Sequence, residues 1–100
     1  MPKAYWIAHV DVHNNEGYKP YAAVNPAIFR KFGGRFVVRG GKFETAEGAS
    51  RSSNVVIEFP DYETAVACYR SPEYQANIKI RQPNATADLI IVEGYEGPQP

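Results

Sequence analysis

The sequence predicts a single α+β domain in which strands and helices follow one another in the order β-α-β-β-α-β. Four short segments are rich in β-branched and aromatic residues, as strands are. The two regions between them repeat apolar residues at steps of three and four, as helices do. The chain has 100 residues, which leaves no room for a second domain. This order is typical of the split βαβ, ferredoxin-like fold, a four-stranded antiparallel sheet with its helices on one face.

The strands are expected at residues 5–12, 35–39, 54–59 and 88–93. The third stops at Pro60, which cannot donate to a strand ladder. Residues 42–47 are a candidate continuation of the second strand, beyond a bulge or bend at Gly40-Gly41. Right-handed crossovers place the second and fourth strands at the edges of the sheet and the first and third in its centre.

The first helical region covers Glu16 to Phe32 and ends at Gly33-Gly34, a suitable C-terminal stop. Pro20 fits only the first turn of a helix, so regular helix is expected to begin near it. Pro26 removes a backbone donor in the middle of the region. We therefore expect a kink there or a break into two helices.

The second helical region begins after Pro60, where Asp61 is a good N-cap. Ser71-Pro72 then restarts a helix, because serine caps well and proline suits the first helical position. This helix is expected to run to about Arg81. The domain is expected to cover residues 1–95, followed by a Gly- and Pro-rich tail at 96–100.

Composition and charge argue against several classes of function. Eleven Lys and Arg residues balance eleven Asp and Glu residues, so the formal net charge is zero. The basic surface of nucleic-acid binders, or of proteins held on anionic membranes, is therefore not expected. No apolar run is long enough to span a bilayer. The single cysteine, Cys68, can form neither an internal disulfide nor a cysteine zinc cage, and we expect a cytoplasmic protein.

Side-chain alternation divides the strands into two faces. One set is wholly apolar and is expected under the helices: Trp6, Ala8, Val10, Val12, Phe36, Val38, Val55, Ile57, Phe59, Ile90 and Val92. The other set mixes charges with Ile7, Val37, Val56, Leu89 and Ile91. So many apolar residues on an open face indicate a partner. Two such sheets packed face to face would give a homodimer with a barrel-like interior, or a higher even oligomer.

The open face also carries the best candidates for chemistry: His9, Asp11 and Arg39. Histidine is a common general base near neutral pH, and Asp11 on the same strand face could orient His9 in that role. Arg39 could fix a carboxylate through its planar guanidinium. The alternative is that these are paired interface groups without a catalytic role. His9 and His13 lie about 13 Å apart on a strand, too far to share an ion, and we expect no metal, haem or other cofactor.

A second constellation lies on the helical regions: Tyr21, Asn25, Tyr69, Ser71, Tyr74 and Arg81. Aromatic walls with an amide and a guanidinium would suit a small flat or carboxylated ligand. The alternative is ordinary helix–sheet core with Ser71 as a capping residue. Ser71 has no nucleophile-elbow motif around it, and Cys68 lies on the expected core face and is expected to be inert.

Five blocks carry a resemblance to a known family. They are Tyr5-Trp-Ile-Ala, Phe32-Gly-Gly-Arg-Phe-Val-Val-Arg-Gly-Gly41, Asn54-Val-Val-Ile-Glu-Phe-Pro60, Cys68-Tyr-Arg-Ser-Pro-Glu-Tyr-Gln75 and Ile91-Val-Glu-Gly-Tyr95. Over nearly its whole length the chain resembles the small bacterial family called domain of unknown function 1330, in the dimeric α/β-barrel superfamily. The resemblance implies a ferredoxin-like subunit that pairs through its sheet, and no established activity. The superfamily includes cofactor-independent monooxygenases, haem proteins and isomerases, so the fold alone does not give a function.

Two classes of function stay open. The first is a small cofactor-independent enzyme acting on a small organic molecule, such as a carboxylated one. The second is a non-catalytic module for ligand binding or homo-oligomeric assembly. An enclosed pocket with polar groups directed into it would favour the first, and a tightly filled interior with every charge paired would favour the second.

Overall fold

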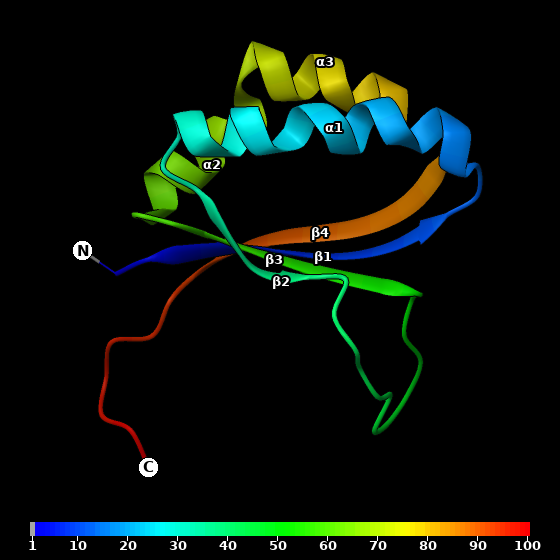
Figure 1. The fold of residues 1–100 in the computed structure, drawn as a ribbon. Coiled ribbons are helices and arrows are strands. Elements are labelled where there is room, and N and C mark those ends of the chain that lie inside the picture. The colour runs from blue at the N-terminus through cyan, green and yellow to red at the C-terminus, as the bar shows by residue number, and fades with distance from the viewer. Residues whose placement is uncertain (1) are drawn as a thin grey trace.

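The computed structural model describes residues 2–100, and over these residues it has four strands and three helices. They are β1 (Ala4–Val12), α1 (Asn15–Lys31), β2 (Arg35–Arg39), β3 (Ser53–Phe59), α2 (Tyr62–Arg70), α3 (Pro72–Arg81) and β4 (Ala85–Glu93). The strands form one antiparallel sheet in the order β2-β3-β1-β4, and the helices cover one of its faces (Figure 1). The predicted fold class and the central position of the first and third strands are confirmed. None of the helices in residues 2–100 combines the length and the apolar run needed to cross a membrane.

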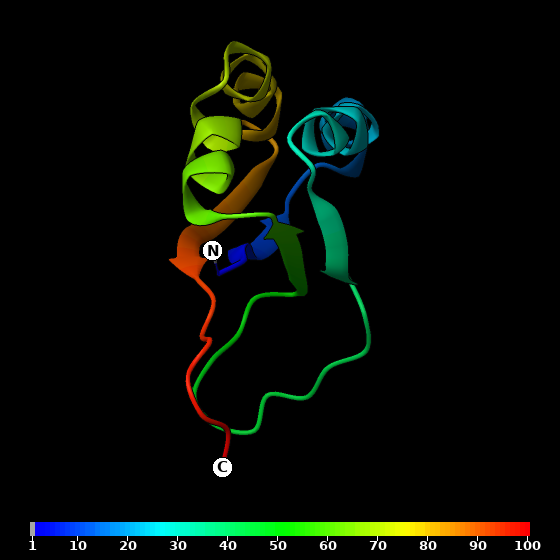
Figure 2. The same cartoon turned by 90° about the vertical axis from the view of Figure 1, so that its left-hand side faces the viewer.

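The helices form two groups above the sheet. Figure 2 shows α1 above β2, and α2 and α3 above the β4 side. Between these helices and the sheet lies an aromatic core centred on Trp6, which is 1% exposed. The indole N–H of Trp6 donates to the carbonyl of Ala65 at 2.9 Å, so its polar atom is satisfied inside the core.

Capping residues set the starts of α2 and α3 as expected, whereas α1 begins at Asn15 and contains Pro20, so the expected start near Pro20 was wrong. The side chain of Asp61 accepts from the backbone N–H of Thr64 at 2.7 Å, and the hydroxyl of Ser71 accepts from that of Tyr74 at 3.2 Å. The expectation for Pro26 was wrong in part, because α1 is one unbroken helix. Buried residues lie on both sides of Pro26, so packing against the rest of the molecule offsets the local cost of the proline.

The register of β4 corrects the predicted faces. Ile91 lies opposite Trp6, and Leu89 occupies the same face two residues earlier, so both pack against the core under the helices. Ile90 and Val92, which were expected there, lie instead on the open face and are 58% and 39% exposed. Residues 89–92 are all apolar, so alternation alone fits either register.

A β-bulge changes the direction of the last side chains of β2. Phe36 pairs with Ile57, but the register then shifts by one residue before Val38. As a result Arg39 pairs with Val55 and shares the helix-covered face with Phe36. An extra residue in one strand has this effect because it reverses the alternation beyond it.

The strand β2 ends at Arg39, and residues 42–47 do not continue it, contrary to expectation. Gly40 has a φ of +64°, a conformation that glycine adopts readily and that turns the chain out of the sheet. Residues 40–52 and the C-terminal residues 94–100 both extend away from the sheet on the side opposite the helices (Figure 1). They flank the open face of the sheet.

Candidate functional site

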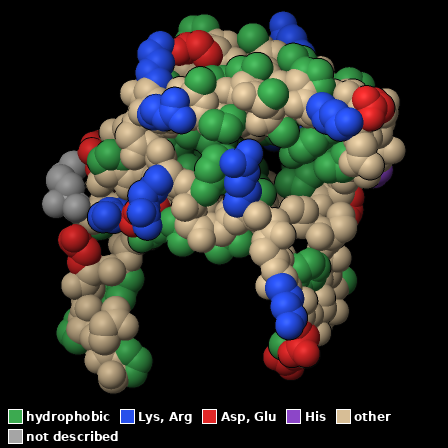
Figure 3. All heavy atoms as spheres, in the orientation of Figure 1, with side chains coloured by type: hydrophobic (Ala, Val, Ile, Leu, Met, Phe, Trp, Pro, Cys, Tyr) green, Lys and Arg blue, Asp and Glu red, His purple; other side chains and the backbone are tan. Residues whose placement is uncertain are grey.

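A cavity of about 210 Å³ lies between α1 and the sheet. Its walls come from α1, α3 and all four strands, and a hollow edged by hydrophobic side chains is visible at the surface (Figure 3). The cavity therefore lies on the helix-covered face, not on the open face.

Aromatic rings form much of the cavity wall. Trp6 meets Phe29 edge to face with ring centroids 5.2 Å apart, and meets Tyr74 in the same way at 4.9 Å. Phe36 packs on Phe29 at 5.7 Å from the β2 side. Rings held in this way are rigid apolar surfaces, which suit a flat hydrophobic ligand.

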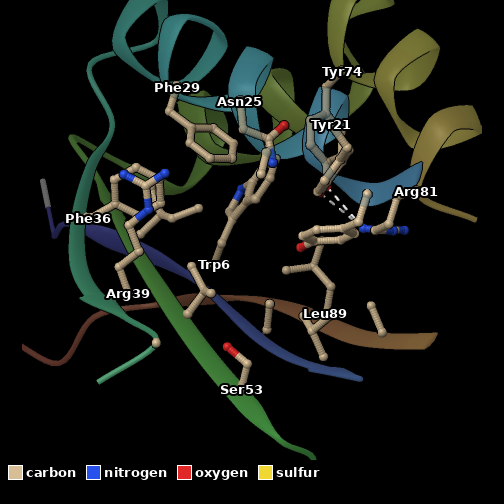
Figure 4. Close-up of a pocket in the computed structure, with 18 residues that line it drawn as sticks. Trp6, Tyr21, Asn25, Phe29, Phe36, Arg39, Ser53, Tyr74, Arg81 and Leu89 are labelled. Atoms are coloured by element: carbon tan, nitrogen blue, oxygen red, sulfur yellow. Dashed lines mark hydrogen bonds between the residues drawn. The ribbon is translucent and has the colours of Figure 1, made fainter. Parts of the chain in front are cut away.

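The charged residues of the cavity wall are both arginines. The guanidinium of Arg39 lies 4.2 Å above the ring of Phe36. On the opposite side of Trp6, Arg81 donates to the hydroxyl of Tyr74 at 3.1 Å and, more weakly, to that of Tyr21 at 3.4 Å (Figure 4). The wall contains no Asp, Glu, Lys or His, and within residues 2–100 neither arginine forms an ion pair. The cavity therefore offers positive charge without a protein anion to balance it.

Two tyrosine hydroxyls meet beside Arg81. The hydroxyl oxygens of Tyr21 and Tyr74 are 2.5 Å apart, and Tyr74 is 1% exposed. Burial raises the pKa of Tyr74, so its hydroxyl stays protonated at neutral pH. Two hydroxyls carry two protons, and only one proton can lie between the two oxygens. The other is available to donate to a ligand.

Amide groups of α1 and α3 meet above the cavity. The side-chain nitrogen of Asn77 donates to the backbone carbonyl of Tyr21 at 3.1 Å and to the side-chain oxygen of Asn25 at 2.8 Å. Asn25 lines the cavity and is 8% exposed, whereas Asn77 lies behind it and is 4% exposed.

The structure separates the three residues predicted as a catalytic set. His9 lies on the open face, where its Nδ1 is 2.8 Å from the side-chain oxygen of Asn54. Asp11 accepts hydrogen bonds from the backbone N–H of Ser52 at 2.8 Å and from the side chain of Arg51 at 2.9 Å. These bonds link Asp11 to the segment just before β3. The prediction that Arg39 shares their face is wrong, because the bulge in β2 directs it to the cavity.

The second predicted constellation is brought together in part. Tyr21, Asn25, Tyr74 and Arg81 all line the cavity. The other two predicted residues lie outside the lining. Tyr69 packs on Trp6 with ring centroids 5.9 Å apart, and Ser71 caps α3. A ligand-binding role for any of these residues stays a prediction.

Several cavity residues were not singled out from the sequence. Trp6, Phe29 and Phe36 could be assigned only to the core, because an apolar residue beside a cavity has the same sequence pattern as one in a filled interior. Asn77 carries no signal in the sequence, since its contact with Asn25 joins two helices that are far apart in the chain. Among residues 2–100, no three His, Cys, Asp or Glu side chains gather into a group that could hold a metal ion.

Solved structures share this fold at low sequence identity. RPA0582 from Rhodopseudomonas palustris, a protein of unknown function, is 20% identical with a TM-score of 0.75, covering 96% of this chain and 85% of its own. SnoaB from Streptomyces nogalater, a cofactor-independent oxygenase, is 13% identical with a TM-score of 0.65, covering 97% of both chains. A Bacteroides thetaiotaomicron protein described as a possible oxidoreductase is 16% identical with a TM-score of 0.56, covering 93% and 98%. At these identities the likeness shows the fold alone.

Comparison with protein families identifies the family of this chain, which the solved structures do not. No protein of curated function matches the chain. The profile of the family described as "Domain of unknown function (DUF1330)" matches residues 3–95. That span includes every strand and helix of the structure and every residue that lines the cavity. The chain is therefore a member of the DUF1330 family, and it shares its fold with RPA0582 and SnoaB.

Proposed function

We propose that this protein binds a small planar organic acid in the cavity between α1 and the sheet. The observation that carries the proposal is the composition of the wall, which combines aromatic rings and two arginines with no acidic residue. An anion inside this space would pair with Arg81, which is half-buried and forms no ion pair within residues 2–100. Arginine is well suited to the role, because its planar guanidinium matches a carboxylate.

The size of the cavity limits the ligand to about one ring. An apolar protein cavity of about 150 Å³ holds a benzene molecule. The present cavity, of about 210 Å³, leaves room for one ring and a carboxylate. Benzoate is therefore a suitable probe, and benzamide is its uncharged counterpart of nearly the same shape.

The protein contains its own reporter for this test. Trp6 is its single tryptophan and forms part of the cavity wall. Titration with benzoate should change its fluorescence along a saturating curve, at lower concentration than titration with benzamide. Equal affinity for the two probes, or no saturation with either, would contradict the proposal.

A second candidate function is cofactor-independent chemistry on the bound acid, and the Tyr21–Tyr74 pair favours it. With Arg81, these hydroxyls place hydrogen-bond donors where an enolate oxygen could be stabilised. Stabilising the enolate makes loss of a proton from the adjacent carbon to solvent easier. The fold likeness to SnoaB, a cofactor-independent oxygenase, is consistent with such chemistry but adds no residue-level support.

Hydrogen exchange distinguishes an enzyme from a binding module. Phenylpyruvate has an exchangeable CH₂ next to its ketone, and its deuteration in D₂O can be followed by NMR. A catalytic site should speed the exchange, and Tyr21→Phe should slow it again without abolishing binding. If bound phenylpyruvate exchanges no faster than the free acid, the protein is a non-catalytic ligand-binding module.

We also propose that the protein forms a homodimer through the open face of its sheet. Ile90, at 58% exposure, and Val38, at 37%, lie on this face beside Ile7 and Val56. A contiguous apolar surface of this kind favours a partner. The flanking segment 40–52 adds an exposed Phe43, which a second copy could cover.

A further inference from the structure

We propose that Asn25 donates a hydrogen bond to the anionic oxygen of the ligand, and that Asn77 is the positioning residue that sets the direction of this donor. The inference rests on the proposed function, since it assigns the end of the cavity at which the acid group is held. Asn77 does not line the cavity, so in this proposal it acts only through Asn25.

A chain of hydrogen bonds fixes which end of the Asn25 amide faces the cavity. The backbone carbonyl of Tyr21 can only accept, so the Asn77 atom 3.1 Å from it must be the amide nitrogen. That nitrogen can only donate, so the Asn25 atom 2.8 Å from it must be the amide oxygen. The NH₂ of Asn25 is therefore turned away from Asn77.

The NH₂ group of Asn25 has no partner among residues 2–100, although the residue is only 8% exposed. In this part of the chain no side-chain nitrogen or oxygen that is fully enclosed lacks a partner, so the nitrogen has accessible surface, and Asn25 is part of the cavity wall. Figure 4 shows it pointing down from α1 toward the sheet, between Trp6 and Tyr21. A buried donor directed into a space without a protein acceptor is arranged for an acceptor on a ligand.

Neighbouring donors indicate that the acid group lies at this end. Tyr21 precedes Asn25 by four residues, so both project from the same side of α1. The hydroxyl of Tyr21 is bound to Tyr74 and Arg81, which come from α3. Three kinds of donor, an amide, a hydroxyl and a guanidinium, therefore lie on the α1–α3 side. Arg39 lies on the far side of Trp6, where it stacks on Phe36 (Figure 4). In this proposal it flanks the ring of the ligand.

Three probes of nearly the same shape test the direction of the donor: benzoate is an anion, benzamide is neutral and benzamidine is a cation. Asn25→Asp keeps an acceptor for Asn77 but replaces the donor facing the cavity with a carboxylate oxygen. Asn77→Asp removes the donor that holds the Asn25 oxygen, so the amide of Asn25 turns and presents its oxygen to the cavity. Asn15→Asp, on the exposed start of α1, makes the same change of charge away from the cavity and is the matched control.

Fluorescence of Trp6 reports the affinity for each probe. Wild type should prefer benzoate to benzamide and bind benzamidine least. In Asn25→Asp and Asn77→Asp the affinity for benzoate should fall about tenfold or more, as expected for the loss of a hydrogen bond to a charged group. Both variants should bind benzamidine more tightly than wild type, which a merely loosened fold would not do. Asn15→Asp should keep the wild-type order.

The outcomes separate this inference from the proposed function. If wild type prefers benzoate and the two cavity variants keep that preference, the role assigned to Asn25 and Asn77 is wrong while the proposed function stands. If no probe binds to wild type, both are wrong.

A measurement on wild type also decides the point should Asn77→Asp fail to fold. The side-chain NH₂ signals of Asn25 in a ¹⁵N spectrum should shift on addition of benzoate, and those of Asn15 should not. Unmoved Asn25 signals in the benzoate-saturated protein would overturn the assignment.

Discussion

Replacing Arg81 with methionine should abolish most of the anion binding while leaving the fold largely intact. Methionine keeps the unbranched apolar part of the side chain and removes the charge and its donors. In the free protein Arg81 contributes one good hydrogen bond, to Tyr74 at 3.1 Å, and a weak one, to Tyr21 at 3.4 Å. Removing a half-buried cation that lacks a carboxylate partner offsets part of that loss. We therefore expect a net destabilisation of about 1 kcal/mol or less.

The expected effect on binding is larger. A hydrogen bond to a charged group contributes about 1.5–3 kcal/mol, so loss of the guanidinium should weaken benzoate binding by roughly 30-fold. At benzoate concentrations of about ten times the wild-type Kd, linkage predicts a stabilisation of about 1.4 kcal/mol for wild type and about 0.2 kcal/mol for Arg81→Met. For a domain of this size these values correspond to shifts in Tm of about 7 °C and about 1 °C.

Thermal unfolding with and without benzoate measures both quantities at once. Arg70→Met is the matched control, because Arg70 is exposed at the end of α2 and does not line the cavity. It should keep the full shift in Tm. If Arg81→Met also keeps the full shift, the anion is not bound at the α1–α3 side of the cavity and the reasoning fails.

Three further predictions concern the rest of the molecule. Val56→Asp should convert the proposed dimer to monomer in light scattering, because it places an unpaired charge in an apolar interface, and an unchanged mass would contradict the proposed interface. Burial raises the pKa of Cys68 to about 12, so iodoacetamide at pH 8 should modify the unfolded protein but not the native one. The backbone N–H of Ser52, with Arg51, holds the pKa of Asp11 below its usual value, so this carboxylate stabilises the fold above the unfolded pKa. Wild type should therefore unfold at higher temperature than Asp11→Asn at pH 7, and this advantage should disappear as the pH falls through the native pKa; an advantage that persists at pH 2 would refute the assignment.

Most of the fold could be predicted from the sequence because its signals are local. Helix caps at Asp61 and Ser71, and the stop at Pro60, depend on a few neighbouring residues and formed as expected. The continuity of α1 through Pro26 could not be predicted in this way. It depends on burial of Tyr21 and Phe29 on either side of the proline, which is a property of the packed molecule.

The candidate site was harder to predict because it depends on alternation across the sheet. One extra residue in β2 moved Arg39 from the open face to the cavity, and Phe36, Val37 and Val38 are all apolar, so the bulge has no signature in the sequence. Helical spacing was more reliable, and the placement of Tyr21 and Asn25 on one side of α1 was correct.

The central claim is that the cavity between α1 and the sheet, not the open face, receives a small planar acid. Intermolecular nuclear Overhauser effects between benzoate and the isotope-labelled protein test it most directly. The account predicts contacts from the benzoate ring to the rings of Trp6 and Phe29. Contacts confined to Ile7 and Ile90 on the open face, or none at saturating benzoate, would contradict it.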